Sequence, residues 1–151
     1  MKAFLFFLTL VILINTTVKA QNAEDSVKAV VNNLFTAMKN SDSILLKTCF
    51  AEKSILQTII KNKEGMASVK DESLNEFVVS VSTSPKGSLD EQIVFDIIRI
   101  DGPLAIVWTP YNFYYNGKFL HCGVNSFQLV KVSGEWKIQY LVDTRRKMGC
   151  K

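Results

Sequence analysis

The residues best suited to chemistry are a histidine, two asparagines and a tryptophan in the C-terminal half of the chain. His121, the one histidine of the sequence, follows an Asn-Gly turn at 116–117 that places Asn112 opposite it on the preceding strand. Asn125 lies four residues further along, and the same register places Trp108 opposite it. An imidazole, two amides and an indole at the edge of an apolar surface are typical of a small-molecule pocket. The histidine could also act as a base near neutral pH.

The same residues allow a purely structural interpretation, in which His121 and the asparagines satisfy one another's hydrogen bonds at a strand end. Asp143 and Arg145 are weaker candidates, because strict alternation from Ile138 points them away from the pocket, whereas one β-bulge would turn them inward. Tyr111 is also weaker, since an aromatic cluster in a strand more often packs than binds. No catalytic residue is assigned. In an enzyme, His121 is expected to act, with Asp143 as its partner.

These candidates are positioned by strands that begin near Glu91 and are joined by tight turns at 101–102, 116–117 and 133–134. Each turn fixes which residues of its two strands lie opposite one another. The three strand registers obtained in this way place the same set of apolar residues on one face of the sheet. Its predicted members are Ile93, Phe95, Ile97, Leu104, Ile106, Trp108, Phe127, Leu129, Ile138 and Tyr140. Two of them, Phe95 and Tyr140, complete the predicted ligand-binding set with Trp108, Asn112, His121 and Asn125.

The opposite face of these strands is half polar and also carries an apolar strip. The strip consists of Val94, Ile98, Val107, Tyr111 and Val124. It predicts that two copies of the chain associate there as a homodimer. Pro110 cannot donate a backbone hydrogen bond, so a bulge near it could shift the register beyond Trp108.

Helical patterns precede the strands. Apolar residues recur at helical spacing from about Glu24 to Lys39, which predicts an amphipathic helix with one buried face. Asp42 is expected to cap a short second helix, and Asp71 or Ser73 a third, with a small hairpin around 62–65 between them. The predicted fold class is α+β: an antiparallel sheet of about four long strands plus a short hairpin, packed on three N-terminal helices.

Residues 1–20 have the composition of a cleavable secretory signal. Lys2 provides a positive start, residues 3–14 form an apolar run, and Ala20 ends a small-residue cleavage site. Residues 21–151 are then one domain, which is exported to the periplasm or secreted. The apolar run is too short to span a bilayer, so no membrane span is expected after cleavage.

Charge and cysteine content argue against several other classes of protein. The net charge of +4 falls by two when Lys2 and Lys19 are removed, which is too little for the basic face of a nucleic-acid binder. Cys49, Cys122 and Cys150 are odd in number, so in an oxidising compartment at most one internal disulfide forms, and its pairing stays open. With one histidine and no closely spaced cysteine pair, neither a metal nor a cofactor is expected.

Four segments carry a resemblance to a known superfamily. They are Gly117-Lys118, His121-Cys122-Gly123-Val124-Asn125-x-Phe127-x-Leu129, Gly134-x-Trp136-Lys137-Ile138 and Asp143-Thr144-Arg145. Together with the order of helices and strands, they resemble the nuclear transport factor 2-like superfamily. More narrowly they resemble its SnoaL-like and lumazine-binding branch of exported bacterial proteins. The resemblance implies that the predicted antiparallel sheet is curved and cone-shaped and closes over the helices. It also implies a fold that hosts binders, enzymes and dimerisation modules alike.

Ketosteroid-isomerase-type members of this superfamily need a carboxylate base and acidic donors that stabilise an enolate. Asn125 stands where those enzymes carry a protonated aspartate, Leu34 lies near the position of their donor tyrosine, and residues 56–59 contain no acid. The isomerase set is therefore absent from this chain. The function expected first is an exported protein whose pocket binds a small apolar or aromatic molecule. The alternatives are a non-catalytic dimerisation or interaction module, and a SnoaL-like isomerase, cyclase or dehydratase that uses His121.

Overall fold

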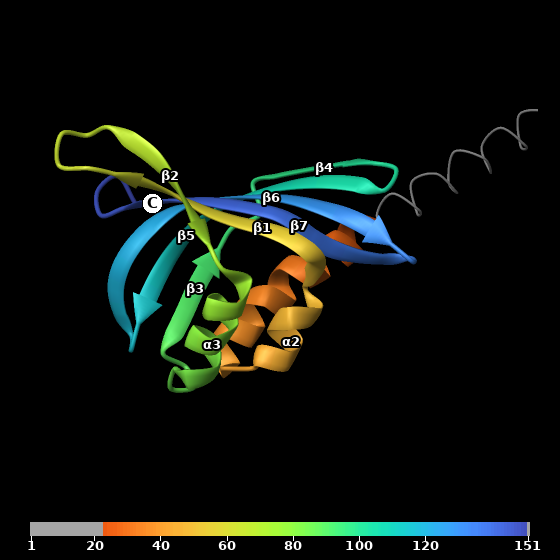
Figure 1. Ribbon diagram of the computed structural model, residues 1–151, viewed down its shortest axis with the longest axis horizontal. Coiled ribbons are helices and arrows are strands. Elements are labelled where there is room, and N and C mark those ends of the chain that lie inside the picture. The colour runs from red at the N-terminus through yellow and green to blue at the C-terminus, as the bar shows by residue number, and fades with distance from the viewer. Residues whose placement is uncertain (1–22, 151) are drawn as a thin grey trace, which may run out of the picture.

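The computed structural model describes residues 23–150, so the predicted signal segment and its cleavage site lie outside the described residues. A helix over residues 23–40 comes first. The elements that follow are α2 (Ser43–Thr48), β1 (Phe50–Lys61), β2 (Ala67–Glu72), α3 (Leu74–Thr83), β3 (Leu89–Ile93), β4 (Ile97–Asp101), β5 (Leu104–Tyr115), β6 (Lys118–Val132) and β7 (Glu135–Arg146). The helices lie together beneath one curved sheet (Figure 1).

All seven strands belong to that sheet, in the order β2-β1-β7-β6-β5-β3, and β4 pairs with β5. The pairing of β1 with β7 is parallel and the other pairings are antiparallel. The sheet curves over the helices without closing into a barrel (Figure 1). These observations confirm the predicted α+β class, and they show that the small hairpin of β1 and β2 is continuous with the main sheet.

The two helices after residue 40 begin at predicted capping residues. Asp42 Oδ1 accepts hydrogen bonds from the backbone N–H groups of Ile44 at 3.1 Å and Leu45 at 2.9 Å. Ser73 Oγ accepts one from the backbone N–H of Glu76 at 3.4 Å. These side chains satisfy amide groups that have no partner inside their own helix. The serine, and not the aspartate two residues before it, therefore caps α3.

Two of the three predicted turns lie where they were expected. Tyr115 pairs with Lys118, and Val132 pairs with Glu135, so residues 116–117 and 133–134 are two-residue connections. The connection between β4 and β5 is instead residues 102–103, because the last residue of β4 pairs with the first residue of β5. Pairing between β4 and β5 is therefore shifted from the predicted register.

A bulge in β6 reverses the predicted face of β5. Phe113 of β5 pairs with His121 of β6, whereas the next residue, Tyr114, pairs with Phe119. Leu120 is therefore an extra, unpaired residue in β6. Beyond this point Trp108 pairs with Ser126 and not with the asparagine before it. Because a shift of one residue turns a strand over relative to its neighbour, β5 presents to the helices the side chains predicted to face outward.

The prediction of the inner face was therefore wrong for β4 and β5 and right for the centre of β6 and the start of β7. Phe127, Leu129 and Ile138 are fully buried as predicted. The predicted core residues that are instead 42–45% exposed are Ile97, Leu104, Ile106 and Trp108. Val107 and Tyr111, which were predicted to belong to the association strip, are buried inside the domain. That strip was consequently wrong, and the outer face of the sheet carries the four exposed apolar residues instead.

A second bulge, in β7, changes which side chains point toward the helices. The pairing with β6 changes step between Gln128 and Leu129, so that Gln139 is an extra residue in β7. Before the bulge Ile138 is fully buried, and after it the residues that line the cavity beneath the sheet are 141, 143 and 145. Tyr140 does not continue the inner face, which corrects the prediction for this residue. The structure has the bulge that would turn Asp143 and Arg145 inward.

The structure also settles the cysteine pairing that the sequence left open. Cys122 and Cys150 form a disulfide that ties the end of the chain to β6. Cys49 is a free thiol that is 3% exposed, and burial raises its pKa to about 11. Such a thiol is unreactive at neutral pH. Within residues 23–150, no helix has the length and apolar character needed to cross a bilayer, and no cluster of histidine, cysteine or acidic residues could hold a metal ion.

Candidate functional site

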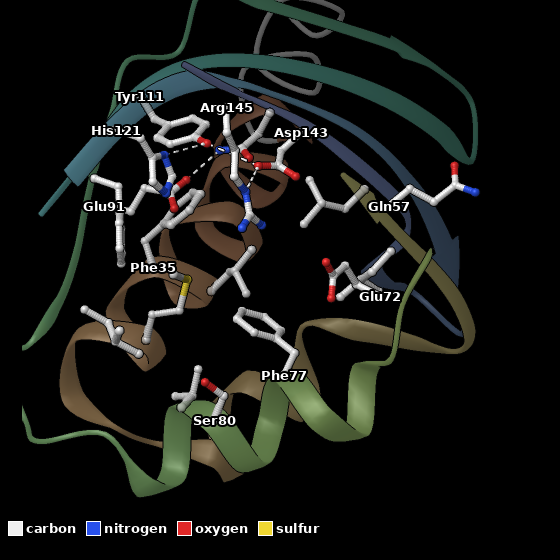
Figure 2. Close-up of a pocket in the computed structure, with 18 of the residues that line it drawn as sticks. Phe35, Gln57, Glu72, Phe77, Ser80, Glu91, Tyr111, His121, Asp143 and Arg145 are labelled. Carbon is white, nitrogen blue, oxygen red and sulfur yellow. Dashed lines mark hydrogen bonds and ion pairs between the residues drawn. The ribbon is translucent and has the colours of Figure 1, made fainter. Parts of the chain in front are cut away.

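A pocket of about 410 Å³ lies between the concave face of the sheet and the helices. Much of its wall is apolar and comes from helix 23–40, α3 and β7, with Leu34, Phe35, Met38, Phe77, Val81 and Leu141. Figure 2 shows Tyr111, His121, Asp143 and Arg145 gathered under the sheet, across the cavity from Phe77 and Ser80 of α3. The pocket thus has an apolar body and one end lined by polar and titratable side chains.

The hydroxyl group of Tyr111 is the centre of the polar end. Its oxygen lies 3.3 Å from His121 Nδ1, 3.2 Å from Asp143 Oδ2 and 3.0 Å from the backbone oxygen of Thr144. The hydroxyl has one proton, and the carboxylate and the carbonyl oxygen can only accept it. When the proton points to either of them, the imidazole Nδ1–H donates to the hydroxyl oxygen. The other imidazole nitrogen, Nε2, is then unprotonated and able to accept a proton or a hydrogen bond.

Gly123 makes this position of the tyrosine ring available. It pairs with Tyr111 in the sheet, and a Cβ atom at residue 123 would lie 1.7 Å from the backbone oxygen of Thr144 and 2.8 Å from the tyrosine Cε1. Any other residue would displace both neighbours. Burial, together with the negative charges of Asp143 and Glu91, raises the pKa of Tyr111 far above its usual value. The hydroxyl therefore stays protonated at neutral pH and acts as a hydrogen-bond donor.

A second polar contact joins β3 to β6. Asn125 Nδ2 donates to Glu91 Oε1 at 2.7 Å, and the asparagine is 5% exposed. Burial raises the pKa of the Glu91 carboxyl to about 7; the charge of Asp143 acts in the same direction, whereas the bond from Asn125 and the charge of Arg145 oppose it. A carboxyl group with this pKa exchanges its proton near neutral pH, which is typical of functional sites.

An ion pair on β7 lies beside these groups. Arg145 Nε donates to Asp143 Oδ2 at 2.8 Å; the arginine side chain is 50% exposed and that of the aspartate 13%. The pKa of His121 is lowered by its burial and by the positive charge of Arg145, with Asp143 opposing the change. His121 is therefore neutral at neutral pH. That state is the one in which Nε2 can accept a proton.

The structure brings five of the sequence-predicted residues together. His121 and Asn125 line the pocket, and so do the weaker candidates Tyr111, Asp143 and Arg145. Asp143 and Tyr111 are close to His121 only because of the bulges at Leu120 and Gln139, which sequence alternation does not reveal. A binding role for these residues stays a prediction, and their shared position is what the proposals below depend on.

The other four predicted residues lie elsewhere. Trp108 is on the outer face of the sheet, and Asn112 pairs with Cys122 instead of facing His121. The Tyr140 hydroxyl donates to Gln57 Oε1 at 2.6 Å. Phe95 packs against the core, with the Lys28 ammonium 5.9 Å from its ring centre. The bulge at Leu120 moves Trp108 and Asn112 away from the pocket, and the bulge at Gln139 does the same to Tyr140.

Sequence reasoning missed Glu91, the titratable residue on β3. A usable signal was present, because Glu91 alternates with Leu89 and Ile93, and this period of two places the three residues on one face of a strand. Gly123 also had a signal, since a glycine inside a strand often marks a close approach by another group.

Comparisons with known proteins bear on the fold and not on the activity. No protein-family model and no curated protein matches this sequence. Among solved structures, an NTF2-like protein of unknown function from Shewanella baltica is similar with a TM-score of 0.64 at 13% identity, over 83% of this chain and 94% of that one. Another from Silicibacter pomeroyi is similar with a TM-score of 0.66 at 16% identity, over 84% and 98% of the two chains.

A third similar structure, from Streptomyces avermitilis, was named a candidate dehydratase of the NTF2-like family. It has a TM-score of 0.63 at 12% identity and covers 84% of this chain and 98% of that one. These likenesses show that the chain has the nuclear transport factor 2-like fold, as the sequence resemblance implied. They do not support the narrower lumazine-binding branch.

Proposed function

We propose that this protein is exported and binds a small molecule whose apolar body fills the pocket and whose polar group meets the titratable end. The observation that carries the proposal is the division of the pocket into an apolar wall and a cluster of Tyr111, His121, Asn125, Glu91 and Asp143. Ligand sites commonly combine a mainly apolar cavity with a few convergent polar groups. A cavity of about 410 Å³ is within the usual range for small ligands.

Export is supported by two independent features of the chain. Residues 1–20 have the pattern of a secretory signal. The disulfide between Cys122 and Cys150 is a bond that persists in oxidising compartments and is rare in the cytosol.

The binding proposal can be tested by filling the pocket from α3. Ser80 and Ser82 are both exposed residues of α3, and of the two Ser80 lines the pocket whereas Ser82 does not. A thermal-shift screen of flavin-like, pterin-like and steroid-like compounds should give compounds that stabilise the wild type and Ser82→Trp but not Ser80→Trp. Native mass spectrometry of protein purified from its own source should show a co-purifying small molecule. A blank screen with no co-purifying mass, or compounds that stabilise both variants equally, would contradict the proposal.

A second candidate function is proton-transfer catalysis, favoured by the chain of contacts from Asp143 through Tyr111 to His121. This arrangement leaves a neutral imidazole nitrogen able to accept a proton, beside a carboxyl group with a pKa of about 7. General acid–base catalysis needs such groups with pKa values close to the working pH.

The enzyme candidate is tested by hydrogen–deuterium exchange into β-tetralone, a ketone with acidic protons next to its carbonyl group. Wild-type protein in D₂O should accelerate exchange above the buffer rate, and His121→Gln should remove the acceleration. Exchange at the buffer rate in the presence of a bound ketone would exclude this chemistry and leave simple binding.

A further inference from the structure

Glu91 is a partly buried residue whose carboxyl group forms no salt bridge with a lysine or arginine among residues 23–150. Its hydrogen-bond partner there is the neutral amide of Asn125, at 2.7 Å. Among the described residues of the pocket wall, the one lysine or arginine is Arg145, which is already bound to Asp143 at 2.8 Å and is half exposed to solvent. A carboxylate that is removed from water without a bound counter-charge is costly, which raises the pKa of this group to about 7, and a positive charge placed beside it would favour the ionised form.

The charges of the pocket wall favour a cationic ligand over an anionic one. Four carboxyl groups line the described pocket, those of Glu72, Glu76, Glu91 and Asp143, against the one guanidinium group. Asp143 is balanced by that guanidinium, and Glu72 by the ammonium of Lys70 at 3.0 Å. Glu76 is exposed to water at the start of α3. Glu91 is therefore the acid whose charge a ligand has most reason to balance.

Resting on the proposed small-molecule function of this pocket, we propose that the ligand carries a basic nitrogen, protonated in solution, which forms an ion pair with Glu91. The apolar body of the ligand lies against the helices, and its ammonium group replaces the missing counter-charge. Lipophilic amines have this combination of an apolar body and one cationic end. Fatty acids and other carboxylates do not, because they would bring a further negative charge to the four acids in the wall.

The groups around Glu91 determine how binding depends on pH. Asn125 and His121 face it from β6, Tyr111 from β5, and the paired Asp143 and Arg145 from β7. Tyr111 and His121 are neutral at neutral pH, so the main change on arrival of an ammonium group is ionisation of Glu91 itself. The protein should therefore release a proton when the amine binds near pH 7, and the affinity should rise as the pH rises through this range.

The test uses three probes of the same shape and different charge: phenylbutylamine, phenylbutanol and phenylbutyrate. Isothermal titration near pH 7.5 should give the tightest binding for the amine, by about tenfold over the alcohol, with the carboxylate weakest. Affinity for the amine should fall by about tenfold between about pH 8.5 and about pH 5.5, while that of the alcohol stays within about twofold. Titrations in two buffers of different ionisation enthalpy should detect the released proton.

Glu91→Gln is the decisive variant, because glutamine keeps an oxygen that can accept the hydrogen bond from Asn125 and cannot ionise. It should lower affinity for the amine by about tenfold and leave affinity for the alcohol unchanged. Glu64→Gln makes the same chemical change in the exposed turn between β1 and β2, and should change neither affinity.

Each other outcome has a distinct meaning. Equal binding of amine and alcohol would overturn the ion-pair inference and leave the small-molecule proposal standing. Preference for phenylbutyrate, lost in Arg145→Gln, would overturn the inference in favour of an anion site. No binding by any of the three probes would overturn the inference, while the screen with Ser80→Trp decides the broader function separately.

Discussion

Replacing Glu91 with glutamine should make the domain more stable at alkaline pH and leave its stability almost unchanged at acidic pH. Enclosure raises the pKa of this carboxyl from an ordinary value of 4.5 to about 7 in the folded protein. Between these two values the folded state binds more protons than the unfolded state, so stability falls as the pH rises. The penalty is complete above pH 7 and absent below the pKa of the unfolded chain.

The size of the effect follows from the same two values. The difference between 4.5 and about 7 corresponds to a penalty of about 3 kcal/mol at high pH. Glutamine removes the penalty and retains an acceptor for the Asn125 amide. The lowered pKa of His121 acts in the opposite direction, because a histidine held neutral costs stability as the pH falls below its ordinary value. The difference between variant and wild type at each pH isolates the carboxyl group from this second effect.

Urea denaturation at about pH 5 and about pH 8 measures that difference directly. Glu91→Gln should be within about 0.5 kcal/mol of the wild type at the lower pH, and about 2–3 kcal/mol more stable at the higher pH. A constant difference at both pH values would show that Glu91 ionises at its ordinary pKa. Glu91 would then lack no counter-charge in the folded protein, which would rule out the proposed ion pair with a ligand amine.

Three further predictions concern the core, the outer face and the N-terminus. Phe127→Ala should cost about 3–5 kcal/mol because its side chain is fully buried, whereas Gln128→Ala should stay within about 0.5 kcal/mol, as measured by urea denaturation. We expect a homodimer through the exposed apolar residues of the outer sheet face, burying about 800 Å² per subunit, so light scattering should show a dimer that Trp108→Lys converts to a monomer. Protein recovered from the exported fraction should begin at Gln21, and sequencing that starts at Met1 would contradict export.

Local signals in the sequence predicted the elements well because each depends on a few neighbouring residues. Correct predictions include the apolar stripe of helix 23–40, the cap at Asp42, and the two-residue turns before Lys118 and Glu135. Each is set by side-chain period or by turn chemistry within a few positions. The burial of Phe127 was also correct, because β6 keeps regular alternation through its centre.

Prediction failed where one extra residue in a strand changed the face of everything beyond it. Leu120 shifts β5 against β6, which moved Trp108 to the outside and Tyr111 to the inside. Neither leucine nor glutamine has a strong preference for a bulge, so the positions of Leu120 and Gln139 cannot be read from composition. Glu91 was missed for a different reason, because its alternation with Leu89 and Ile93 extends over a single strand of only 5 residues.

The bulge at Gln139 also divides β7 into a part that packs in the core and a part that lines the pocket. Before Gln139, the inward residues of β7 are Trp136 and Ile138, which are buried in the core. After it, the inward positions carry Asp143 and Arg145, which would point to the outer face in a regular strand. Since bulges redirect side chains at the cost of only one unpaired residue, they allow one strand to provide both core and site. The cluster around Tyr111 therefore depends on irregular pairing, and removing the extra residue from β7 would disperse it while leaving Trp136 and Ile138, which precede the bulge, in the core.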